Sequence, residues 1–439
     1  MTDIQLDETH DPKRRSWVES ANLPDADFPI QNLPYCVFRR KGESGAQIGV
    51  AIGDRILNVA GIASWLDKKI GGASDFLSGS SLAPLMAQPP AIWTELRRLF
   101  GQLLEAGSVG RGVCEPHLIP AIDAELQMPV RPGSFVDFFA SIQHATNAGS
   151  LFRPTSPLLP NYKYVPIAYN GRVSTIRAGS GDVHRPHGQR KLADRDAPDF
   201  GPTRRFDYEM ELGIFLGGNT KVGHPVPIAE AWDHIFGFCV LNDWSARDIQ
   251  AWEYQPLGPF LGKSFATSIS PWVVTADALR PFRAAARART ADDPDLLPYL
   301  SNSEDQQTGS LQIDVETWFR SDSMQARGLP PVKVGAASAA GLYWTPAQMV
   351  AHQTSNGCNI EAGDLYGTGT ISGDSRDNLG SLLEITRNGS QPITPSEGVT
   401  RTFLEDGDEI TLTARCRRTG FASIGFGRCS GRVVPSPKD

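Results

Sequence analysis

One acidic segment, FDYEMELGIFL at residues 206–216, constrains the fold more than any other part of the chain. If the segment is a β-strand with a two-residue period, its even-numbered residues form a continuous apolar face. The opposite face carries three carboxylates, Asp207, Glu209 and Glu211. Because like charges at alternate positions repel, this face must be either solvated or neutralised by positive charge. Periodicity alone leaves both interpretations open, although most charged residues in proteins are exposed.

Short apolar segments separated by Gly, Pro and Asp turns predict a mixed, mostly β fold. In the first part of the chain the predicted strands are YCVFRR, QIGVAIGD and RILNVAG. A helix is predicted after Pro89-Pro90, where Ile92, Leu96, Leu99 and Leu103 recur at helical spacing. Further strands are predicted at FDYEMELGIFL, HIFGFCVLND, SISPWVVT, LQIDVETWF, LLEITRNG, DEITLTARC and SIGFGRC.

A linker-like stretch, EPHLIPAIDAELQMPVRPG, separates these two groups of strands. The length of 439 residues is sufficient for two domains. We therefore expect a small N-terminal β-domain at residues 1–127 and a larger mixed β-domain at residues 128–439.

Composition excludes several classes of function. The net charge of -7, without runs of Lys and Arg longer than three residues, gives no basic surface for nucleic acid or anionic membrane. The polar N-terminus MTDIQLDETHDPKRR lacks the apolar core of a signal peptide, and the sequence contains no run of 18 apolar residues. Six cysteines without CxxC spacing suggest neither a zinc site nor a disulfide framework. We expect a cytoplasmic protein with no nucleic-acid or membrane partner.

A second acidic signal suggests a metal site. Asp243 directly follows the apolar strand HIFGFCVLN, about thirty residues after Glu209 and Glu211. If the three carboxylates share one pocket, a divalent cation is the simplest group that neutralises them. Oxygen ligands without a neighbouring His or Cys favour Mg²⁺, Ca²⁺ or Mn²⁺ over zinc or copper. The sequence leaves open whether these carboxylates meet.

Three more segments combine polar residue types that suit catalysis, although each also has an ordinary structural explanation. A lone His is more often a structural hydrogen-bonding residue than a base, a dense polar run can be an interfacial loop, and Gly-rich loops look like turns. The segments are FVDFFASIQHATNAG with Asp137 and His144, NDWSARDIQAWEYQPLGPFLGKSF with Arg247, Asp248, Gln250, Tyr254 and Lys263, and GTGTISG with Thr368 and Thr370, followed by Glu384 on a predicted strand.

The segments FFASIQHATNAGSLFRP, NDWSARDIQAWEYQPLGPFLGKSF, GTISG and IGFGRCSG resemble the fumarylacetoacetate hydrolase family. The similarity extends to NLPYCVF and IGVAIGD near the N-terminus, and the run at residues 242–265 is too specific for a chance match. The resemblance implies a small N-terminal domain of SH3-like, barrel-like β structure, a β-roll catalytic domain and a homodimer. It also implies hydrolysis of 4-fumarylacetoacetate to fumarate and acetoacetate, the last step of tyrosine and phenylalanine catabolism.

The resemblance also assigns a metal site, usually occupied by Ca²⁺ or Mg²⁺ in this family. Its ligands would be Asp137, Glu209, Glu211 and Asp243. A second cation site in the family uses the same Asp together with residues that correspond to Lys263 and Thr267. Because an ammonium ion cannot be a ligand, the role of Lys263 in that second site needs a separate test.

For catalysis, the resemblance makes His144 the general base and Glu384 the residue that orients it. Attack of water on a ketone carbonyl needs a base with a pKa near neutrality, and a carboxylate-held His supplies one. The resulting oxyanion needs hydrogen-bond donors. Those donors would be Arg247, Gln250 and Lys263, and the implied substrate-binding residues are Phe139, Arg153, Tyr169, Gln250, Tyr254 and Thr370.

Two departures from the family pattern bear on substrate preference. Phe139 replaces a substrate-contacting Tyr, and Asn170 replaces the His of a GYHGR motif. One alternative is therefore a related hydrolase of an acylpyruvate or 3,5-dioxo acid, or a decarboxylase or hydratase of the same superfamily. A Ca²⁺-dependent binding module is a second alternative, but such a module has no need for a His–Glu pair and three oxyanion donors.

Overall fold

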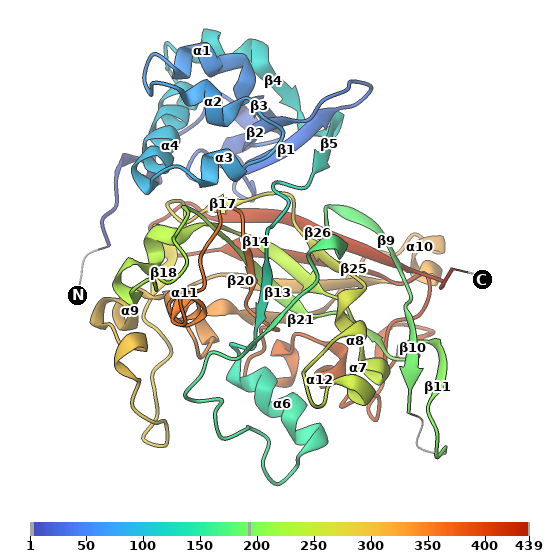
Figure 1. The fold of residues 1–439 in the computed structure, drawn as a ribbon. Helices are drawn as coiled ribbons and strands as arrows, with labels where there is room; N and C mark the ends of the chain where they lie inside the picture. The colour runs from blue at the N-terminus through green and yellow to red at the C-terminus, as the bar shows by residue number, and fades with distance from the viewer. Residues whose placement is uncertain (1–3, 192–194, 438–439) are drawn as a thin grey trace.

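The computed structural model describes residues 4–191 and 195–437 and has a mostly β architecture, as predicted. A smaller N-terminal unit, blue in Figure 1, lies against one end of a larger unit built on two sheets. The smaller unit contains an antiparallel sheet in the order β4-β3-β2-β1-β5. Its strands are Leu118–Pro120 (β4), Arg55–Asn58 (β3), Gln47–Ile52 (β2), Tyr35–Arg40 (β1) and Ala124–Gln127 (β5).

Helix α4, Pro90–Leu104, confirms the helix predicted after the Pro-Pro pair. Pro90 occupies the first turn, where its missing N–H leaves no intrahelical bond unmade. The helix buries Leu96, Leu99 and Leu103 in the core of the N-terminal unit. The other helices of this unit are Ala63–Leu66 (α1), Ala73–Leu77 (α2), Ala83–Met86 (α3) and Arg111–Cys114 (α5).

The central sheet of the larger unit has the order β7-β6-β22-β13-β14-β16-β8, with β17 also paired to β14. Strands β13 and β14 are antiparallel and buried along their whole length. The strands are Ala168–Asn170 (β7), Phe135–Phe138 (β6), Leu365–Gly367 (β22), Met210–Leu216 (β13), Ile235–Asp243 (β14), Thr267–Ile269 (β16), Ile176–Ala178 (β8) and Val274–Thr275 (β17).

A second sheet packs against this one, in the order β21-β20-β25-β26-β9. Its strands are Val332–Ser338 (β21), Asp314–Arg320 (β20), Glu409–Cys416 (β25), Ile424–Val434 (β26) and Ser180–His184 (β9). Trp244 follows β14 and joins the two layers, because its ring lies where Gly431 of β26 has no side chain. A Cβ atom added at Gly431 would lie 2.3 Å from Cζ2 of Trp244.

Short helices gather at the end of the larger unit that lies away from the N-terminal unit (Figure 1). They are Ile142–Phe152 (α6), Arg247–Glu253 (α7), Leu261–Ser264 (α8) and Leu382–Ile385 (α12). Elsewhere lie Ser303–Thr308 (α9), Asp322–Ala326 (α10) and Pro346–Thr354 (α11). Two-stranded pairs complete the larger unit: His187–Arg190 (β10) with Asp199–Pro202 (β11), Phe206–Asp207 (β12) with Ser245–Ala246 (β15), Arg283–Ala284 (β18) with Ser310–Leu311 (β19), and Ile393–Ser396 (β23) with Val399–Arg401 (β24).

The acidic segment at residues 206–216 forms two strands, β12 and β13, and not one. Between the two strands, side chains accept hydrogen bonds from the backbone N–H groups. Asp207 Oδ1 accepts from the N–H of Tyr208, and Asn242 Oδ1 accepts from the N–H of Glu209. The predicted strand SISPWVVT is likewise divided into β16 and β17, because Pro271 between them has no N–H for the ladder. The predicted LQIDVETWF strand is divided into β19 and β20.

The prediction of a strand at LLEITRNG is wrong, because this segment forms helix α12 and a turn. Asp207 accepts hydrogen bonds from the first N–H groups of α12, those of Leu382 and Leu383, at 2.8 and 2.9 Å. After the helix, Arg387 and Asn388 adopt positive φ angles of 47° and 56°. No described helix is both long and apolar enough to cross a membrane.

We expect Trp244→Ala to lower the free energy of unfolding by about 3–5 kcal/mol, the usual cost of truncating a buried aromatic side chain. Trp244 is fully buried, and its Nε1 donates to Ser268 Oγ at 2.9 Å. Denaturant titration followed by fluorescence measures the change. Trp252→Ala is the matched control, because Trp252 is 43% exposed and its loss should cost about 1 kcal/mol or less. Equal losses for the two variants would contradict the role given to Trp244.

Candidate active site

The pairing of the central sheet brings the predicted acidic residues together. Parallel strands β6 and β22 place Asp137 opposite Gly367, and β22 lies beside β13, the strand of Glu211. Asp243 ends β14 on the other side of β13. As a result, Asp137, Glu209, Glu211 and Asp243 each place a carboxylate oxygen within 4.8 Å of the others. All four side chains are buried, which excludes the interpretation of a solvated acidic face.

Gly367 allows this approach of β6, β22 and β13. A Cβ atom added at Gly367 would lie 2.4 Å from Asp137 Oδ1 and 3.0 Å from Glu211 Oε2. Such distances are too short for a side-chain carbon, so any larger residue would push the two carboxylates apart. The carboxylate positions therefore depend on the absence of a side chain at Gly367 as well as on strand register.

Two cations neutralise part of the cluster. Lys263 Nζ contacts Glu209 Oε2 and lies 2.8 Å from Asp243 Oδ2. Arg247 Nη1 lies 2.7 Å from Glu209 Oε1. Burial alone would raise the pKa of Glu209, but the combined charges of Lys263 and Arg247 hold it below its usual range. Glu209 is therefore an ionised carboxylate.

The other half of the cluster has too few positive neighbours. Burial, followed by the charge of Asp243, raises the pKa of Asp137, and burial, followed by Asp137, raises the pKa of Glu211. Among the described residues, Asp137 Oδ1 and Glu211 Oε1 have no hydrogen-bond partner. Buried oxygens without partners are costly unless a ligand takes them. The donor set of carboxylate oxygens fits Mg²⁺, Ca²⁺ or Mn²⁺.

Lys263 and Thr267, predicted at a second cation site, both lie beside Asp243. Although burial disfavours the charged form of Lys263, Asp243 and Glu209 raise its pKa above the usual range, so its amino group stays an ammonium. It donates hydrogen bonds and offers no lone pair to a metal. Thr267 Oγ1 donates to Asp243 Oδ1 at 2.9 Å. These contacts support a charge-balancing role for Lys263, and its role as a ligand stays an untested prediction.

The predicted His–Glu pair is formed between helices α6 and α12. His144 Nδ1 lies 2.7 Å from Glu384 Oε2, and both side chains are buried. Ser141 begins α6 and accepts from the N–H of His144, which fixes the start of the helix. The sequence pattern predicts a strand at Glu384, but this residue lies on the single turn of α12.

Three further residues hold the Glu384 carboxylate, and no pattern in the sequence distinguishes them. They donate hydrogen bonds of 2.9 Å each, from Asn147 Nδ2 to Oε1, and from Ser372 Oγ and Ser381 Oγ to Oε2. Burial raises the pKa of Glu384, but His144 and these donors together lower it below its usual value. Glu384 is therefore a fixed anion beside the imidazole.

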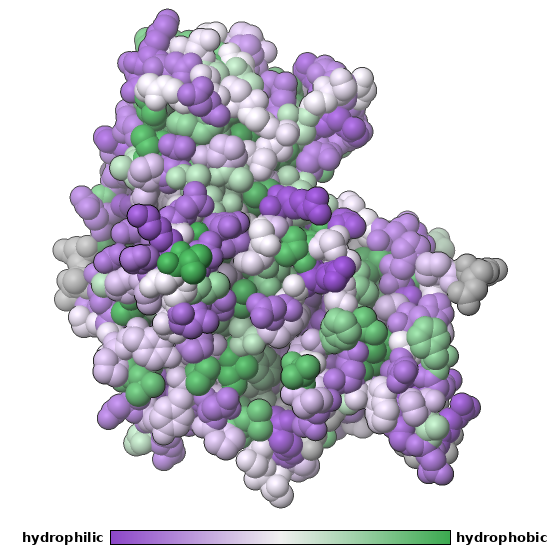
Figure 2. Space-filling view, viewed as in Figure 1, coloured by the Kyte–Doolittle hydropathy of each residue, from purple (hydrophilic) through white to green (hydrophobic). Residues whose placement is uncertain are grey.

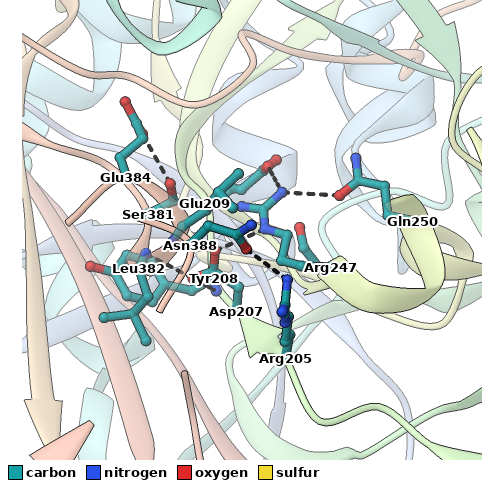
Figure 3. A network of polar contacts seen from close by, with 12 residues as sticks. Arg205, Asp207, Tyr208, Glu209, Arg247, Gln250, Ser381, Leu382, Glu384 and Asn388 are labelled. Atoms are coloured by element: carbon teal, nitrogen blue, oxygen red, sulfur yellow. Dashed lines mark hydrogen bonds and ion pairs between the residues drawn. The ribbon is translucent and has the colours of Figure 1, made fainter. Parts of the chain in front are cut away.

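Asp207 has a role that the alternation of the acidic segment does not predict, since it does not join Glu209 and Glu211 in the cluster. Figure 3 shows it between Arg247 and the beginning of α12. It accepts from Arg247 Nε at 2.8 Å and from the backbone of Leu382 and Leu383. Asp207 thus connects the guanidinium of Arg247 to the helix that carries Glu384. The alternation with Glu209 predicts that Asp207 shares a strand face with it, but it does not predict these partners.

A cavity of about 700 Å³ opens beside these groups. Its lining includes polar atoms that are buried and have no partner among the described residues, namely Arg153 Nε, Arg247 Nη2 and Thr370 Oγ1. Apolar side chains, green in Figure 2, gather in the lower half of the face shown, the half that carries α6 and α7. Predicted site residues in the lining are Asp137, Phe139, His144, Arg153, Tyr169, Glu209, Arg247, Gln250, Tyr254, Lys263 and Thr370.

The remaining predicted residues, Glu211, Asp243, Thr267 and Glu384, lie behind this lining and contact it through neighbours. Glu211 Oε2, for example, accepts from the N–H of Gly369, a lining residue, at 3.1 Å. Tyr169 donates from its hydroxyl to Asp243 Oδ2 at 2.7 Å. The cavity therefore borders both the carboxylate cluster and the His–Glu pair.

Both departures from the family pattern lie on the cavity wall. Phe139 meets His144 edge to face, with 5.4 Å between ring centroids, and Asn170 also lines the cavity. The Phe139 main-chain oxygen accepts from the Tyr162 hydroxyl at 2.7 Å, which fixes the backbone there. The phenyl ring therefore offers an apolar contact where a phenol would offer a hydroxyl.

Comparison with known proteins identifies two family profiles in the chain. The profile described as "Fumarylacetoacetate (FAA) hydrolase C-terminal" matches residues 134–434, and "Fumarylacetoacetase N-terminal" matches residues 31–129. Fumarylacetoacetase of Caenorhabditis elegans is 43% identical over 419 residues, 94% of this chain and 97% of that protein. Human fumarylacetoacetase is 40% identical over 419 residues, with the same coverage. A solved structure of a putative HpcE protein from Mycobacterium smegmatis has a TM-score of 0.51 at 19% identity, with 91% of this chain and 99% of that chain covered, which shows the fold alone.

We expect a divalent cation to stabilise the chelator-treated protein, and more strongly at about pH 8 than at about pH 6. Without metal, the pKa values of Asp137 and Glu211 are raised in the folded state, so protonation of these groups favours folding. This contribution to the free energy of unfolding is lost as the pH rises through the two raised pKa values. Bound cation offsets that loss and competes with protons. At about 100 times its Kd, Mg²⁺, Ca²⁺ or Mn²⁺ should add about 3 kcal/mol, measured by calorimetry.

Asp137→Asn and Glu211→Gln should each remove most of this stabilisation, because each variant loses one charged ligand. Glu43→Gln is the matched control at an exposed carboxylate and should retain it. An unchanged melting temperature with cation at both pH values would contradict the metal site.

Proposed function

Because this chain belongs to the fumarylacetoacetate hydrolase family and is similar to fumarylacetoacetases over nearly its whole length, we propose that it cleaves 4-fumarylacetoacetate to fumarate and acetoacetate. This reaction would serve the last step of tyrosine and phenylalanine catabolism. The observation that carries the proposal is the junction of the His144–Glu384 pair and the buried carboxylate cluster at one cavity. Hydrolysis of a carbon–carbon bond needs both a base for water and charge stabilisation for the leaving group.

The cluster of Asp137, Glu209, Glu211 and Asp243 would hold the cation, with Mg²⁺ or Ca²⁺ as the proposed species. Lys263 and Arg247 supply two positive charges, and Arg247 shares its charge with Asp207, so a divalent ion would offset most of the negative charge that remains on the cluster. When bound, such an ion would supply Lewis-acid stabilisation for negative charge on the dioxo part of the substrate.

His144 is the proposed general base. Because its Nδ1 faces Glu384, the proton at Nδ1 is held by that carboxylate and Nε2 is left as the acceptor. Water loses a proton to Nε2 as its oxygen attacks the carbonyl carbon of the fumaroyl group. Glu384 then stabilises the imidazolium, as the carboxylate of a catalytic triad does.

The oxyanion that forms would be bound by donors of Arg247, Gln250 and Lys263. Arg247 Nη2 is buried and has no partner in the described chain, so it is available to a substrate oxygen. Gln250 Oε1 accepts from Arg247 Nη1 at 3.2 Å, which leaves the amide N–H₂ group of Gln250 as a donor. Fixed donors of this kind contribute more than mobile water because they need no reorganisation.

In the second half of the reaction the carbonyl re-forms and the carbon–carbon bond breaks. Its electron pair passes to the acetoacetate fragment, which takes a proton from the His144 imidazolium. The other fragment leaves as fumarate after its new carboxyl group loses a proton. His144 thus returns to its neutral form, and one water is consumed for each bond cleaved.

A direct assay decides between this function and its alternatives. Purified protein with Mg²⁺ or Ca²⁺ should remove the enol absorbance of fumarylacetoacetate and release fumarate and acetoacetate. A related acylpyruvate, tested in parallel, should be a poorer substrate. Turnover of the acylpyruvate alone would favour the related hydrolase, and no turnover of either compound would favour a binding module.

We expect His144→Ala to lower kcat by about 10²- to 10⁴-fold while leaving fold and metal content unchanged. Glu384→Gln should lower kcat in the same direction, because its amide cannot stabilise an imidazolium as a carboxylate does. If the two residues act as one unit, the double variant should be little slower than His144→Ala. His224→Ala, at an exposed His, is the matched control.

Full activity of a folded, metal-loaded His144→Ala protein would remove His144 from the mechanism. Independent losses that multiply in the double variant would leave both residues important but would contradict their pairing.

We also propose that the protein is a homodimer, as the family resemblance and the prevalence of twofold assemblies suggest. Light scattering at micromolar concentration should give about twice the 47.7 kDa of one chain. A mass close to that of one chain would contradict this proposal.

A further inference from the structure

The cavity contains more positive charge than the carboxylate cluster uses. Its lining contains four cationic side chains, Arg153, Arg205, Arg247 and Lys263. Arg247 and Lys263 form ion pairs with buried carboxylates. In the described part of the chain, Arg153 and Arg205 form no ion pair with a carboxylate. Two guanidinium groups therefore face a cavity without anionic partners of their own.

Arg205 is held in place at this cavity by two contacts. Its Nη1 donates to Asn388 Oδ1 at 3.0 Å, and its guanidinium lies 5.9 Å from the ring centroid of Phe403. Figure 3 shows its side chain directed towards Asn388, beside Arg247. Because Arg205 is exposed and also lines the cavity, it lies where the cavity opens to solvent.

The partner of Arg205 is itself fixed by the turn after α12. Asn388 has a left-handed backbone with a φ of 56°, and its N–H donates to the carbonyl of Leu383 at 2.8 Å. Asn tolerates this conformation better than most residues. The main-chain oxygen of Arg205 accepts from the N–H of Arg247 at 2.9 Å, so the backbone of Arg205 is also fixed. The guanidinium is therefore pre-positioned, and its remaining N–H groups stay available.

We propose that Arg205 is a specificity-determining residue that binds one of the two terminal carboxylates of the substrate at the mouth of the cavity. This inference rests on the proposed function, because 4-fumarylacetoacetate carries a carboxylate at each end. The family resemblance implies that Arg153 binds the substrate. The second carboxylate of the substrate then needs a second cationic side chain. A guanidinium binds a carboxylate through two parallel hydrogen bonds, which fixes orientation as well as charge.

The contact selects for the length and charge of the substrate. A substrate with a single carboxylate would satisfy one of the two arginines and gain nothing from the other. The position at the mouth is partly solvated, so the contact is weaker than a buried ion pair and is screened by salt. Arg205 should therefore act on substrate binding and leave the chemical step at His144 almost unchanged.

Steady-state kinetics of Arg205→Gln with fumarylacetoacetate test the proposal. We expect KM to rise about three- to tenfold with kcat changed by less than about twofold, as for a charge-assisted contact at a partly solvated site. Arg205→Lys should recover part of the loss, because it restores charge but not the planar fork. The increase in KM should shrink at high salt.

Arg204→Gln is the matched control. Arg204 precedes Arg205, is exposed and carries the same charge, but it does not line the cavity. It therefore reports the general effect of removing one positive charge near the mouth, and its KM should stay close to that of the unmodified protein.

The inhibition constants of the two products supply a second readout, which does not depend on the kcat of the variant. Fumarate and acetoacetate each retain one carboxylate end of the substrate. The inhibition constant of one of the two products should therefore rise in Arg205→Gln. The product whose inhibition constant rises identifies the substrate end that Arg205 binds. Equal KM values for Arg205→Gln and Arg204→Gln, with unchanged inhibition by both products, would overturn the inference and leave the proposed function standing. No hydrolysis by the unmodified protein would instead overturn the proposed function.

Discussion

The burial of four carboxylates at one place is the constraint on which the rest of the site depends. Isolated ionised carboxylates are strongly disfavoured away from water, so the fold must supply charge, hydrogen bonds or both. Lys263 and Arg247 supply charge to Glu209 and Asp243. Asp137 and Glu211 are left with raised pKa values, and one oxygen of each has no hydrogen-bond partner among the described residues, which is the physical case for a cation.

That compensation explains why two cationic side chains, Arg247 and Lys263, lie in the wall of the cavity. Arg247 contacts Asp207 and Glu209 with Nε and Nη1, while its Nη2 has no partner in the described chain. One guanidinium thus neutralises buried acids and still presents a donor to the cavity. Lysine would offer a single point of charge and could not divide these tasks between separate nitrogens.

Sequence reasoning located the acidic segment, the mostly β fold and helix α4, because period and turn residues are local properties. It failed where a distant residue decides the local structure. LLEITRNG reads as a strand, but Asp207 binds the first N–H groups of α12, and the two residues are separated by about 175 positions along the chain. Asp207 was grouped with Glu209 and Glu211 for the same reason, since alternation shows the face of a residue and not its partners.

The resemblance to a family added what periodicity could not, since it selected His144 and Glu384 from residues that look ordinary by type. The structure brings them to a 2.7 Å contact, although their positions are 240 residues apart. It also shows the supporting hydrogen bonds of Ser372 and Ser381, which no pattern in the sequence distinguishes from other serines. Such partners can be found only once the chain is folded.

Helix α12 is a single turn, yet its two ends reach different parts of the site. Asp207 binds its first N–H groups, and the turn after its last residue carries Asn388, which holds Arg205. Glu384 lies between these ends. This helix of four residues therefore supports both Arg205 at the entrance of the cavity and the imidazole of His144. Evolution of a new substrate range by reshaping the Arg387–Asn388 turn would be limited by this shared support, because a displacement at the entrance also displaces the Glu384 carboxylate that contacts His144.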